Sequence, residues 1–597
     1  MTPTPDTTRP GAAGVLLAGI AWGSLAALGQ VARIFRRSYI NGEFAWSSRD
    51  VYWMMPLANA LYFSLAAILI WSILRLTRGG ASSPAVSGTL AGLCVFASLL
   101  PFGGIHEYAV LVLAIGVGLQ WARWMRKGHR RLERLAHVGG LTAGALLLIG
   151  GLIERGTRER RGAPALSVSA APDSPNVLVI IWDTVRAASL SLYGSERPTT
   201  PELTRLAATS TTYDWAIAPA PWTLPSHCSM FTGLQHGEHG CGWESALSHG
   251  PTTLAEVFAR NGYRTGGFVA NRFYASHETG LQRGFVTYDD FPATLRQVLL
   301  SSSLAQMAIV RELATGVGIA NKTHSLRRFK LRGGDKPLVD RKRAPSVTDE
   351  FLTWQARSPE PFFAFLNYFD AHDPYDPPEP WRTRFSTDPD RLARYEGGIA
   401  YLDDELGRLT RELSRRGLLD NTIVVVTSDH GEMHGEHGLS FHGNALYLPL
   451  LHVPLVIRFP ERLPQGVRVA RPAPLRDLAR TLTQLAGLPD TMPGVSFGSS
   501  AWWAEPVPSD PQLDRLVLSE TQKLRDFIGL GPAGKGPMHG LVDDRYHYIR
   551  NADGIEELYD YRTDRAEEVN LAQTPDGAIR SARYRLLLPA MTRSLVK

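Results

Sequence analysis

The segment PAPWTLPSHCSMFTG covers residues 219–233, and six consecutive positions within it carry four reactive side chains. They are Thr223, Ser226, His227 and Cys228. A cysteine thiol is the most nucleophilic of these groups at neutral pH, whereas a hydroxyl needs a neighbouring base or a metal ion to activate it. The choice of nucleophile therefore depends on what the rest of the chain brings to this segment.

Three apolar runs elsewhere in the chain have the character of buried strands. They are NVLVIIWDT (176–184), PFFAFLNYFDAHDPY (361–375) and NTIVVVTSDHGE (421–432). Continuous apolar runs are typical of strands that are buried on both faces of a parallel sheet. Helical patterns such as SVTDEFLTWQA and YEGGIAYLDDELGRLTRELSRRG lie between them. Alternating strands and helices predict an α/β fold.

Each of these strands ends in side chains that can bind a metal ion. The groups are Asp183, Asp370 with His372, and Asp429 with His430. In open α/β sheets, ligands bind outside the carboxyl ends of the strands. We therefore expect the functional site at this edge of the sheet.

The first 153 residues have a different character and predict a membrane module. Residues 13–32 and 51–74 are uncharged and about long enough to cross a bilayer as helices. Weaker apolar runs follow at about 84–102, 108–122 and 138–153, which gives a prediction of about five spans. A cleavable signal peptide or buried core helices are alternatives, but they account poorly for a cluster of five runs.

The distribution of arginine and lysine gives a weak indication of orientation. The basic segment 121–137 favours a cytoplasmic location, which places everything after residue 154 outside the cytoplasm. Arginines around 33–49 and 155–161 oppose this orientation and nearly balance the count. We expect a multi-pass protein of the inner or plasma membrane with an extracytoplasmic catalytic domain. The formal net charge of +6 lies largely beside the spans, where it favours lipid headgroups over nucleic acid as partner.

The remaining chain divides into a linker, a catalytic domain and a C-terminal subdomain. Residues 154–175 are charged and then rich in Ala, Ser and Pro, as in a linker. We expect the catalytic domain at 176–490 and the subdomain at 491–597. Residues 291–343 have the character of an insertion, and 322–343 carry nine Lys or Arg against two Asp. A solvated face is expected there, with contact to an anionic membrane surface as the alternative.

Three cysteines do not make a disulfide framework. Cys94 lies in a predicted span. Cys228 and Cys241 could pair in an oxidising compartment, but we favour two small buried residues.

Several segments in a fixed order resemble the sulfatase branch of the alkaline phosphatase superfamily, over about 176–570. They are NVLVIIWDTVRAASLSLYG, RPTTPELTRLA, APWTLPSHCSMFTGL, NYFDAHDPYDPP, GIAYLDDELGRL, and TSDHGEMHGEHGLSFHGNALY followed by HVPLVIRFP. The tail YHYIRNADGIEELYDYRTDRAEEVNLA resembles the small C-terminal subdomain of these enzymes. The resemblance implies an alkaline phosphatase-like sulfatase fold, with a mostly parallel central sheet flanked by helices. It also implies metal-dependent hydrolysis or transfer of sulfate or phosphate esters.

The resemblance implies metal ligands at Asp183, Asp429 and His430, with the nucleophile Thr223 also touching the metal. Such a donor set suits Ca²⁺, Mg²⁺, Mn²⁺ or Zn²⁺, and the histidine tilts the expectation towards Mn²⁺ or Zn²⁺. Many sulfatases have a second acid where this chain has Thr184, which leaves the set one carboxylate short. A helix N-cap is the alternative role for Asp183.

The resemblance also implies contacts with the substrate. His372 and His442 match histidine or lysine positions that touch the anion or assist the leaving group. His227 stands where the family has arginine, and Asn271 lies near the position of a family lysine. Glu432 supporting the metal ligands and His437 are weaker candidates.

The nucleophile departs most from the family. Typical sulfatases carry Cys-x-Pro-x-Arg or Ser-x-Pro-x-Arg, whose first residue becomes formylglycine. Aligned on Pro225, this chain has Thr223 first and His227 last, and Cys228 lacks the rest of the motif. Threonine is the pattern of the superfamily's phosphodiesterases and phosphoethanolamine transferases. A helix N-cap is the alternative role for Thr223.

These observations predict a membrane-bound, metal-dependent hydrolase of sulfuric or phosphoric esters with a Thr223 nucleophile. A phosphoethanolamine-type transferase acting on a membrane lipid or glycan is the close alternative. A catalytically inactive membrane scaffold is an alternative of another class, supported by the missing acid, arginine and lysine.

Overall fold

The computed structural model describes residues 11–78, 83–101, 105–161, 169–291, 293–307, 342–489, 492–498, 502, 515–523 and 531–592. The chain forms two compact units. One consists of Met1–Gly162 with Pro292–Arg341, and the other of Ala163–Phe291 with Lys342–Lys597. We refer to them as the helical unit and the catalytic unit. The chain therefore leaves the catalytic unit after Phe291 and returns to it at Lys342.

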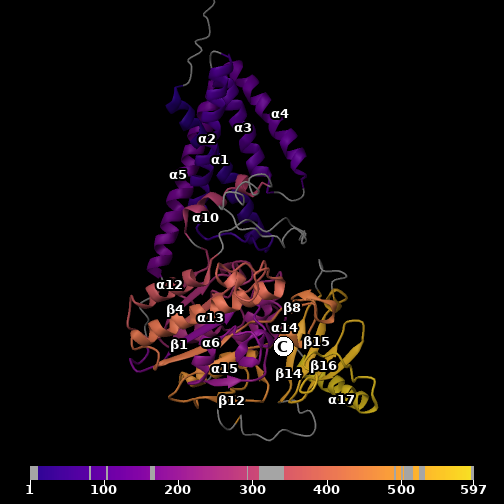
Figure 1. The fold of residues 1–597 in the computed structure, drawn as a ribbon. Helices are drawn as coiled ribbons and strands as arrows, with labels where there is room; N and C mark the ends of the chain where they lie inside the picture. The colour runs from indigo at the N-terminus through magenta and orange to yellow at the C-terminus, as the bar shows by residue number, and fades with distance from the viewer. Residues whose placement is uncertain are drawn as a thin grey trace, which may run out of the picture. The chain divides into compact units, whose positions relative to one another are not determined.

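The helical unit contains five apolar helices at the predicted places (Figure 1). They are α1 (Ala12–Phe35), α2 (Val51–Arg78), α3 (Ser83–Leu99), α4 (Glu107–Arg126) and α5 (Arg130–Arg161). Within the described residues, all but α3 are long and apolar enough to span a membrane. α3 is a shorter apolar helix. The lengths and composition of these helices agree with a membrane module.

Glycines let the helices of this unit approach each other closely. A Cβ at Gly23 in α1 would lie 2.5 Å from the carbonyl oxygen of Asn59 in α2. A Cβ at Gly92 in α3 would lie 2.7 Å from the carbonyl oxygen of Ala114 in α4. Small residues at such crossings are typical of helices that associate in lipid, where close van der Waals packing replaces the hydrophobic effect.

The catalytic unit is built on an eight-stranded sheet of order β12-β2-β11-β7-β1-β6-β4-β5. β7, β1, β6, β4 and β5 run parallel, and β11 is antiparallel to both of its neighbours. The strands are β1 (Asn176–Trp182), β2 (Thr211–Tyr213), β4 (Arg264–Val269), β5 (Thr287–Asp289), β6 (Phe362–Tyr368), β7 (Thr422–Thr427), β11 (Leu455–Arg458) and β12 (Val467–Val469). The three predicted strands are thus neighbours at the centre of the sheet, and each is fully buried.

Helices cover both faces of this sheet. Alternate residues of β6 show the division, because Phe362 and Leu366 join a core cluster with α12 and α13 while Phe363 and Phe365 contact aromatic rings of α9 and α7. The main helices are α6 (Pro201–Ala207), α7 (Thr223–Thr232), α9 (Leu254–Arg260), α12 (Ala344–Gln355), α13 (Arg391–Arg415) and α15 (Leu478–Leu485). Burial on both faces explains why the central strands are apolar throughout.

The C-terminal part forms a small α+β subdomain. Its four antiparallel strands are β14 (Val517–Thr521), β15 (Met538–Val542), β16 (Tyr546–Arg550) and β17 (Glu556–Asp560), and α17 (Pro575–Met591) packs against them. Smaller elements complete the unit: β3 (Ala216–Ile217), β8 (Met433–His434), β9 (Ser440–Phe441), β10 (His452–Val453), β13 (Ala473–Pro474), α8 (His236–His239) and α14 (Leu448–Leu451). The predicted α/β class with a C-terminal subdomain is confirmed.

Candidate active site

The carboxyl ends of four neighbouring parallel strands bring the predicted site residues together. Asp183 follows β1 directly, Asp429 and His430 follow β7, and Asn271 follows β4. Asn367 is the penultimate residue of β6 and lies beside Val269 in the register. Parallel strands end at the same edge of the sheet, so residues about 250 positions apart in the sequence meet there.

Asp183, Asp429 and His430 form a compact donor set. Each offers one ligand atom, these atoms lie within 4.8 Å of one another, and all three side chains are fully buried. Oδ1 of Asp183 and Oδ2 of Asp429 accept no hydrogen bond from any described residue. Buried carboxylate oxygens without a partner are costly unless a cation lies beside them. The donor set therefore fits a divalent metal ion.

The electrostatics of the two carboxylates agree with this. Burial, followed by the charge of Asp429, raises the pKa of Asp183 well above its usual value. Burial alone would also raise the pKa of Asp429, but His430, His227 and two backbone N–H donors together lower it. No described Lys or Arg forms an ion pair with either carboxylate. A bound cation would allow both groups to be ionised at neutral pH.

His430 presents a free lone pair to this cluster. Its Nδ1 lies 2.9 Å from the carbonyl oxygen of Gly431, which can only accept a hydrogen bond. Nδ1 must therefore carry the proton, and Nε2 keeps its lone pair. Burial lowers the pKa of His430 to about 4, so the ring is neutral at physiological pH. A neutral imidazole held in this tautomer is the form that binds a metal ion.

Thr223 is the first residue of α7, and its hydroxyl faces the donor set. Oγ1 lies 3.3 Å from Nε2 of His430 and 3.4 Å from Nδ2 of Asn271. The N-cap of α7 is Trp222, and no side chain caps this end of the helix. Thr223 therefore does not act as the N-cap of α7, the alternative role that the sequence had left open.

Two asparagines hold Asp183 in place. Asn271 donates to Oδ2 of Asp183 over 2.8 Å, and Asn367 donates to the same oxygen over 3.3 Å. The backbone N–H of Asn271 donates to Oδ1 of Asn367 over 2.8 Å, which fixes the two amides relative to each other. Sequence reasoning missed Asn367. Its signal was a single amide in the otherwise apolar run PFFAFLNYF, next to the strand end.

Thr184 stands where a second acid is common, and its side chain turns away from the donor set. Its hydroxyl donates to the carbonyl oxygen of Asp183 over 2.6 Å. Its backbone N–H donates to Oδ1 of Asp429 over 3.2 Å, from a left-handed conformation with φ 65°. Thr184 therefore positions Asp429 through its backbone and supplies no third carboxylate.

His442 lies next to this cluster and is oriented by Glu432. The ring of His442 lies 4.6 Å from that of His430, and its Nδ1 lies 3.1 Å from Oε1 of Glu432. Burial would raise the pKa of Glu432, but His442 and two further histidines lower it to about 2. The ionised carboxylate accepts the Nδ1 proton, which leaves Nε2 of His442 for another partner.

His372 and Trp222 both contact the ring of His442. The ring of His372 stacks on Phe369 at 4.2 Å and lies 5.2 Å from the ring of His442. The ring of Trp222 lies 4.9 Å from that of His442. His442 thus contacts His430 of the donor set and His372 contacts His442, and the roles of both histidines stay predictions.

Asp370 has a structural role, contrary to the expectation that it could bind a metal ion. Its Oδ1 pairs with Nη1 of Arg343 over 3.1 Å, and its Oδ2 accepts the N–H of Ala344, the first residue of α12, over 2.9 Å. It therefore fixes the start of α12.

His227 lies within α7, and its ring contacts those of Phe231 in the same helix and Phe365 of β6. Its Nδ1 lies 2.8 Å from the carbonyl oxygen of Thr223 and 3.6 Å from Oδ2 of Asp429. This geometry makes it a neighbour of Asp429, and contact with a substrate stays a prediction. His437 lies elsewhere, stacked on Tyr447 and bonded to the backbone of Ala566.

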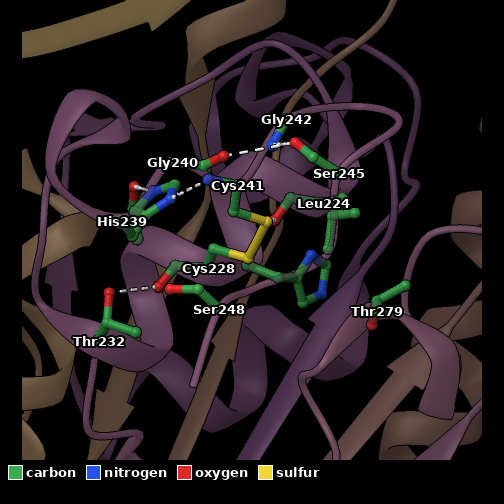
Figure 2. Close-up of a disulfide and its surroundings, with 12 residues drawn as sticks. Leu224, Cys228, Thr232, His239, Gly240, Cys241, Gly242, Ser245, Ser248 and Thr279 are labelled. Carbon is green, nitrogen blue, oxygen red and sulfur yellow. Dashed lines mark hydrogen bonds between the residues drawn. A yellow bond between two sulfur atoms is a disulfide. The ribbon is translucent and has the colours of Figure 1, made fainter. Parts of the chain in front are cut away.

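Cys228 and Cys241 form a disulfide, so the preference for two unpaired buried cysteines was wrong (Figure 2). Cys228 lies in α7, five residues after Thr223, and Cys241 follows α8. His239 also links the segment around Cys241 to α7. Its Nε2 lies 3.0 Å from Oγ of Ser229 in α7, and its Nδ1 accepts the N–H of Cys241 over 3.0 Å. The return of the chain to α7, which brings the two cysteines together, could not be predicted from the sequence. Helix α7, which begins at Thr223, is thus covalently cross-linked.

Comparisons with known proteins agree with the fold and identify the family. A family profile described as Sulfatase matches residues 175–488, which is more than half of the chain. An arylsulfatase of Clostridium perfringens is 24% identical over 493 residues, covering 71% of this chain and 94% of that protein. Arylsulfatase K of Bos taurus is 25% identical over 477 residues, covering 69% and 80% of the two chains.

Among solved structures, the phosphonate monoester hydrolase of Agrobacterium radiobacter shares the fold with a TM-score of 0.54. It is 22% identical, and the match covers 70% of this chain and 95% of that one. Together, the ordered motifs, the strand-end site and the profile match show that the chain belongs to the sulfatase family of ester hydrolases.

Proposed function

We propose that this enzyme cleaves phosphodiesters at a membrane, with Thr223 as a covalent nucleophile beside a divalent metal ion. One observation carries the proposal. Oγ1 of Thr223 lies 3.3 Å from Nε2 of His430, next to two buried carboxylate oxygens that accept no hydrogen bond from any described residue. When bound by Asp183, Asp429, His430 and Thr223, a divalent cation would favour the alkoxide form of the threonine.

The identity of the nucleophile favours phosphorus over sulfur. A formylglycine hydrate can release sulfate by elimination, because the aldehyde re-forms. A threonine adduct has no such route and must be displaced by a second attack on the central atom. Such double displacement is ordinary phosphoryl chemistry, and an enzyme that relied on it for sulfate would regenerate slowly.

Among the described residues, no Lys or Arg pairs with Asp183 or Asp429, which favours a singly charged ester. His227 and Asn271 occupy the positions of the family arginine and lysine. Asn271 is uncharged and donates to Asp183, and His227 lies beside Asp429. A phosphomonoester dianion needs more positive charge than a diester monoanion. Phosphodiesters meet both conditions, since they carry one charge and react at phosphorus.

The reaction that follows has two displacements. In the first, Thr223 releases its hydroxyl proton to solvent, Oγ1 bonds to phosphorus, and the leaving alcohol departs with the electron pair of the P–O bond. It takes up a proton from the protonated ring of His442, which lies 4.6 Å from the ring of His430, or from that of His372, which lies 5.2 Å from His442. In the second, water or an acceptor hydroxyl attacks phosphorus, and the threonine oxygen leaves. Water gives hydrolysis, and an acceptor hydroxyl gives transfer of the phosphate-linked group.

A membrane substrate is part of the proposal. The apolar helices support anchoring in a bilayer, which would keep the site near lipid- or glycan-linked esters.

We place the catalytic unit outside the cytoplasm, and the Cys228–Cys241 disulfide supports this, because disulfides persist in oxidising compartments. Peptide mapping of the membrane-purified protein, alkylated before digestion without reductant, should find these two cysteines linked. Alkylation of both thiols would contradict this location.

A substrate panel tests the proposed function. The purified full-length enzyme, supplied with Mn²⁺ or Zn²⁺, is assayed with aryl esters that share one leaving group: a phosphodiester, a phosphomonoester and a sulfate. We expect kcat/KM for the phosphodiester to exceed both others at least about tenfold, or about 1.4 kcal/mol. A preference for the sulfate would contradict phosphorus chemistry.

A further inference from the structure

Residues 293–307 follow directly after a part of the catalytic unit in the sequence, but they pack within the helical unit. They form α10 (Leu295–Leu300) and the short 3-10 helix η5 (Ser303–Gln306). Tyr62 of α2 donates from its hydroxyl to the carbonyl oxygen of Leu299 over 3.1 Å. The segment thus contacts a helix that lies more than 230 positions earlier in the chain.

The centre of this contact is a pair of buried amides. Gln30 of α1 and Asn59 of α2 exchange two hydrogen bonds of 3.3 Å, and their exposed fractions are 3% and 0%. Amides inside apolar helices are costly unless every donor and acceptor has a partner. Each amide oxygen has a second lone pair that the partner amide leaves unused.

The segment supplies the missing donors. Ser302 donates from Oγ to Oδ1 of Asn59 over 3.0 Å, and the N–H of Ser303 donates to Oε1 of Gln30 over 3.2 Å. Ser303 also donates from Oγ to the carbonyl oxygen of Ala97 in α3 over 2.6 Å. The two serines therefore join three helices of the unit, and both are buried.

Apolar contacts surround these hydrogen bonds. Leu300 and Ala305 are buried together with Tyr62 packed against them. Leu304 packs against Phe96 of α3 and Val110 of α4. This first part of the insertion is thus a buried element. The basic stretch 322–343, expected to form a solvated face, lies outside the described residues except for Lys342 and Arg343. These two bond to Asp289 and Asp370 inside the catalytic unit.

We propose that residues 295–306 are a docking element that holds the catalytic unit to the membrane without help from the 154–175 linker. The proposal rests on the proposed membrane anchoring. Only residues 290–294 separate the end of β5 from Leu295. At about 3.5 Å per extended residue, this connection can span at most about 20 Å. The catalytic unit is thereby tied close to the bilayer, where a lipid-linked diester would be presented.

Cleavage of the linker tests this directly. A recognition sequence for a site-specific protease is inserted between residues 163 and 168 of the full-length chain, and membranes are treated with the protease. They are then washed with high salt, which removes proteins held only by surface charge, and centrifuged. We expect the cleaved catalytic fragment, residues 169–597, to stay in the pellet.

Two variants show whether the serines cause this retention. Ser302→Asp with Ser303→Asp places charges against buried amides and should release the cleaved fragment, raising its soluble share several-fold. The matched control is Ser301→Asp, because the Ser301 hydroxyl bonds only to Val298 of its own helix. This variant should stay in the pellet.

Two results would overturn the proposal: release of the fragment from the unsubstituted protein, or retention of the double variant. Turnover of a soluble phosphodiester, measured on all the uncleaved proteins, should stay unchanged. Loss of docking is thereby distinguished from failure of the proposed function, which would abolish turnover and leave retention intact.

Discussion

Thr223→Ala is expected to abolish phosphodiester turnover while leaving the fold intact. Loss of the nucleophile removes both displacements, so kcat/KM should fall at least about 1,000-fold, which corresponds to about 4 kcal/mol. The melting temperature should stay within a few degrees, because Thr223 does not cap α7 and its hydroxyl makes only long contacts of 3.3 and 3.4 Å. Steady-state kinetics and thermal unfolding measure the two effects.

Two further variants sharpen this prediction. Thr223→Ser keeps the hydroxyl and should retain part of the activity. Thr232→Ala removes a buried hydroxyl at the other end of α7, where it bonds to the carbonyl oxygen of Cys228, and should leave kcat/KM nearly unchanged. Undiminished turnover by Thr223→Ala, in protein free of the unsubstituted chain, would exclude Thr223 as nucleophile.

Removal of the metal ion is expected to have an effect of similar size. Dialysis against a chelator should abolish turnover, and Mn²⁺ or Zn²⁺ should restore it. Asp183→Asn keeps the shape of the side chain and its place between Asn271 and Asn367 but removes the charge. It should lower metal affinity and kcat/KM at least about 100-fold. Elemental analysis and metal titration of the purified variant measure the first effect.

Asp370→Asn is the matched control for this substitution. Asp370 is equally buried and also follows a central strand, but it pairs with Arg343 and α12. Its asparagine variant should lose stability and keep the metal content of the unsubstituted protein. If instead Asp183→Asn kept its metal, or the chelated enzyme kept its turnover, the donor set would have been assigned wrongly.

The sequence predicts the edge of the sheet where the site forms, because apolar runs ending in Asp183 and Asp429 identify adjacent buried strands. It does not predict the direction of each side chain beyond a strand end. Asp370 shows this: the chain turns after β6 so that its carboxylate meets the N-terminus of α12. Asn367 was missed for the converse reason, since an amide within a strand carries no motif of its own.

Long-range contacts were the least predictable feature. The Cys228–Cys241 bridge depends on how the connection after α7 folds back, and the sequence alone left both the bridge and free thiols open. The docking of Ser302 and Ser303 depends on partners more than 200 positions away. Their residue types are ordinary, and only the packing of α1, α2 and α3 makes them significant.

The most direct test of the central claim is the chemical identity of the trapped nucleophile. The enzyme is mixed with an aryl phosphodiester, quenched in acid within the first turnover and digested for mass spectrometry of the peptide that contains Thr223. We predict a phosphorus-linked adduct on Thr223 that disappears on further incubation and is absent from Thr223→Ala. A sulfate adduct formed from an aryl sulfate at a higher rate, or a phosphorus adduct on another residue, would contradict the account.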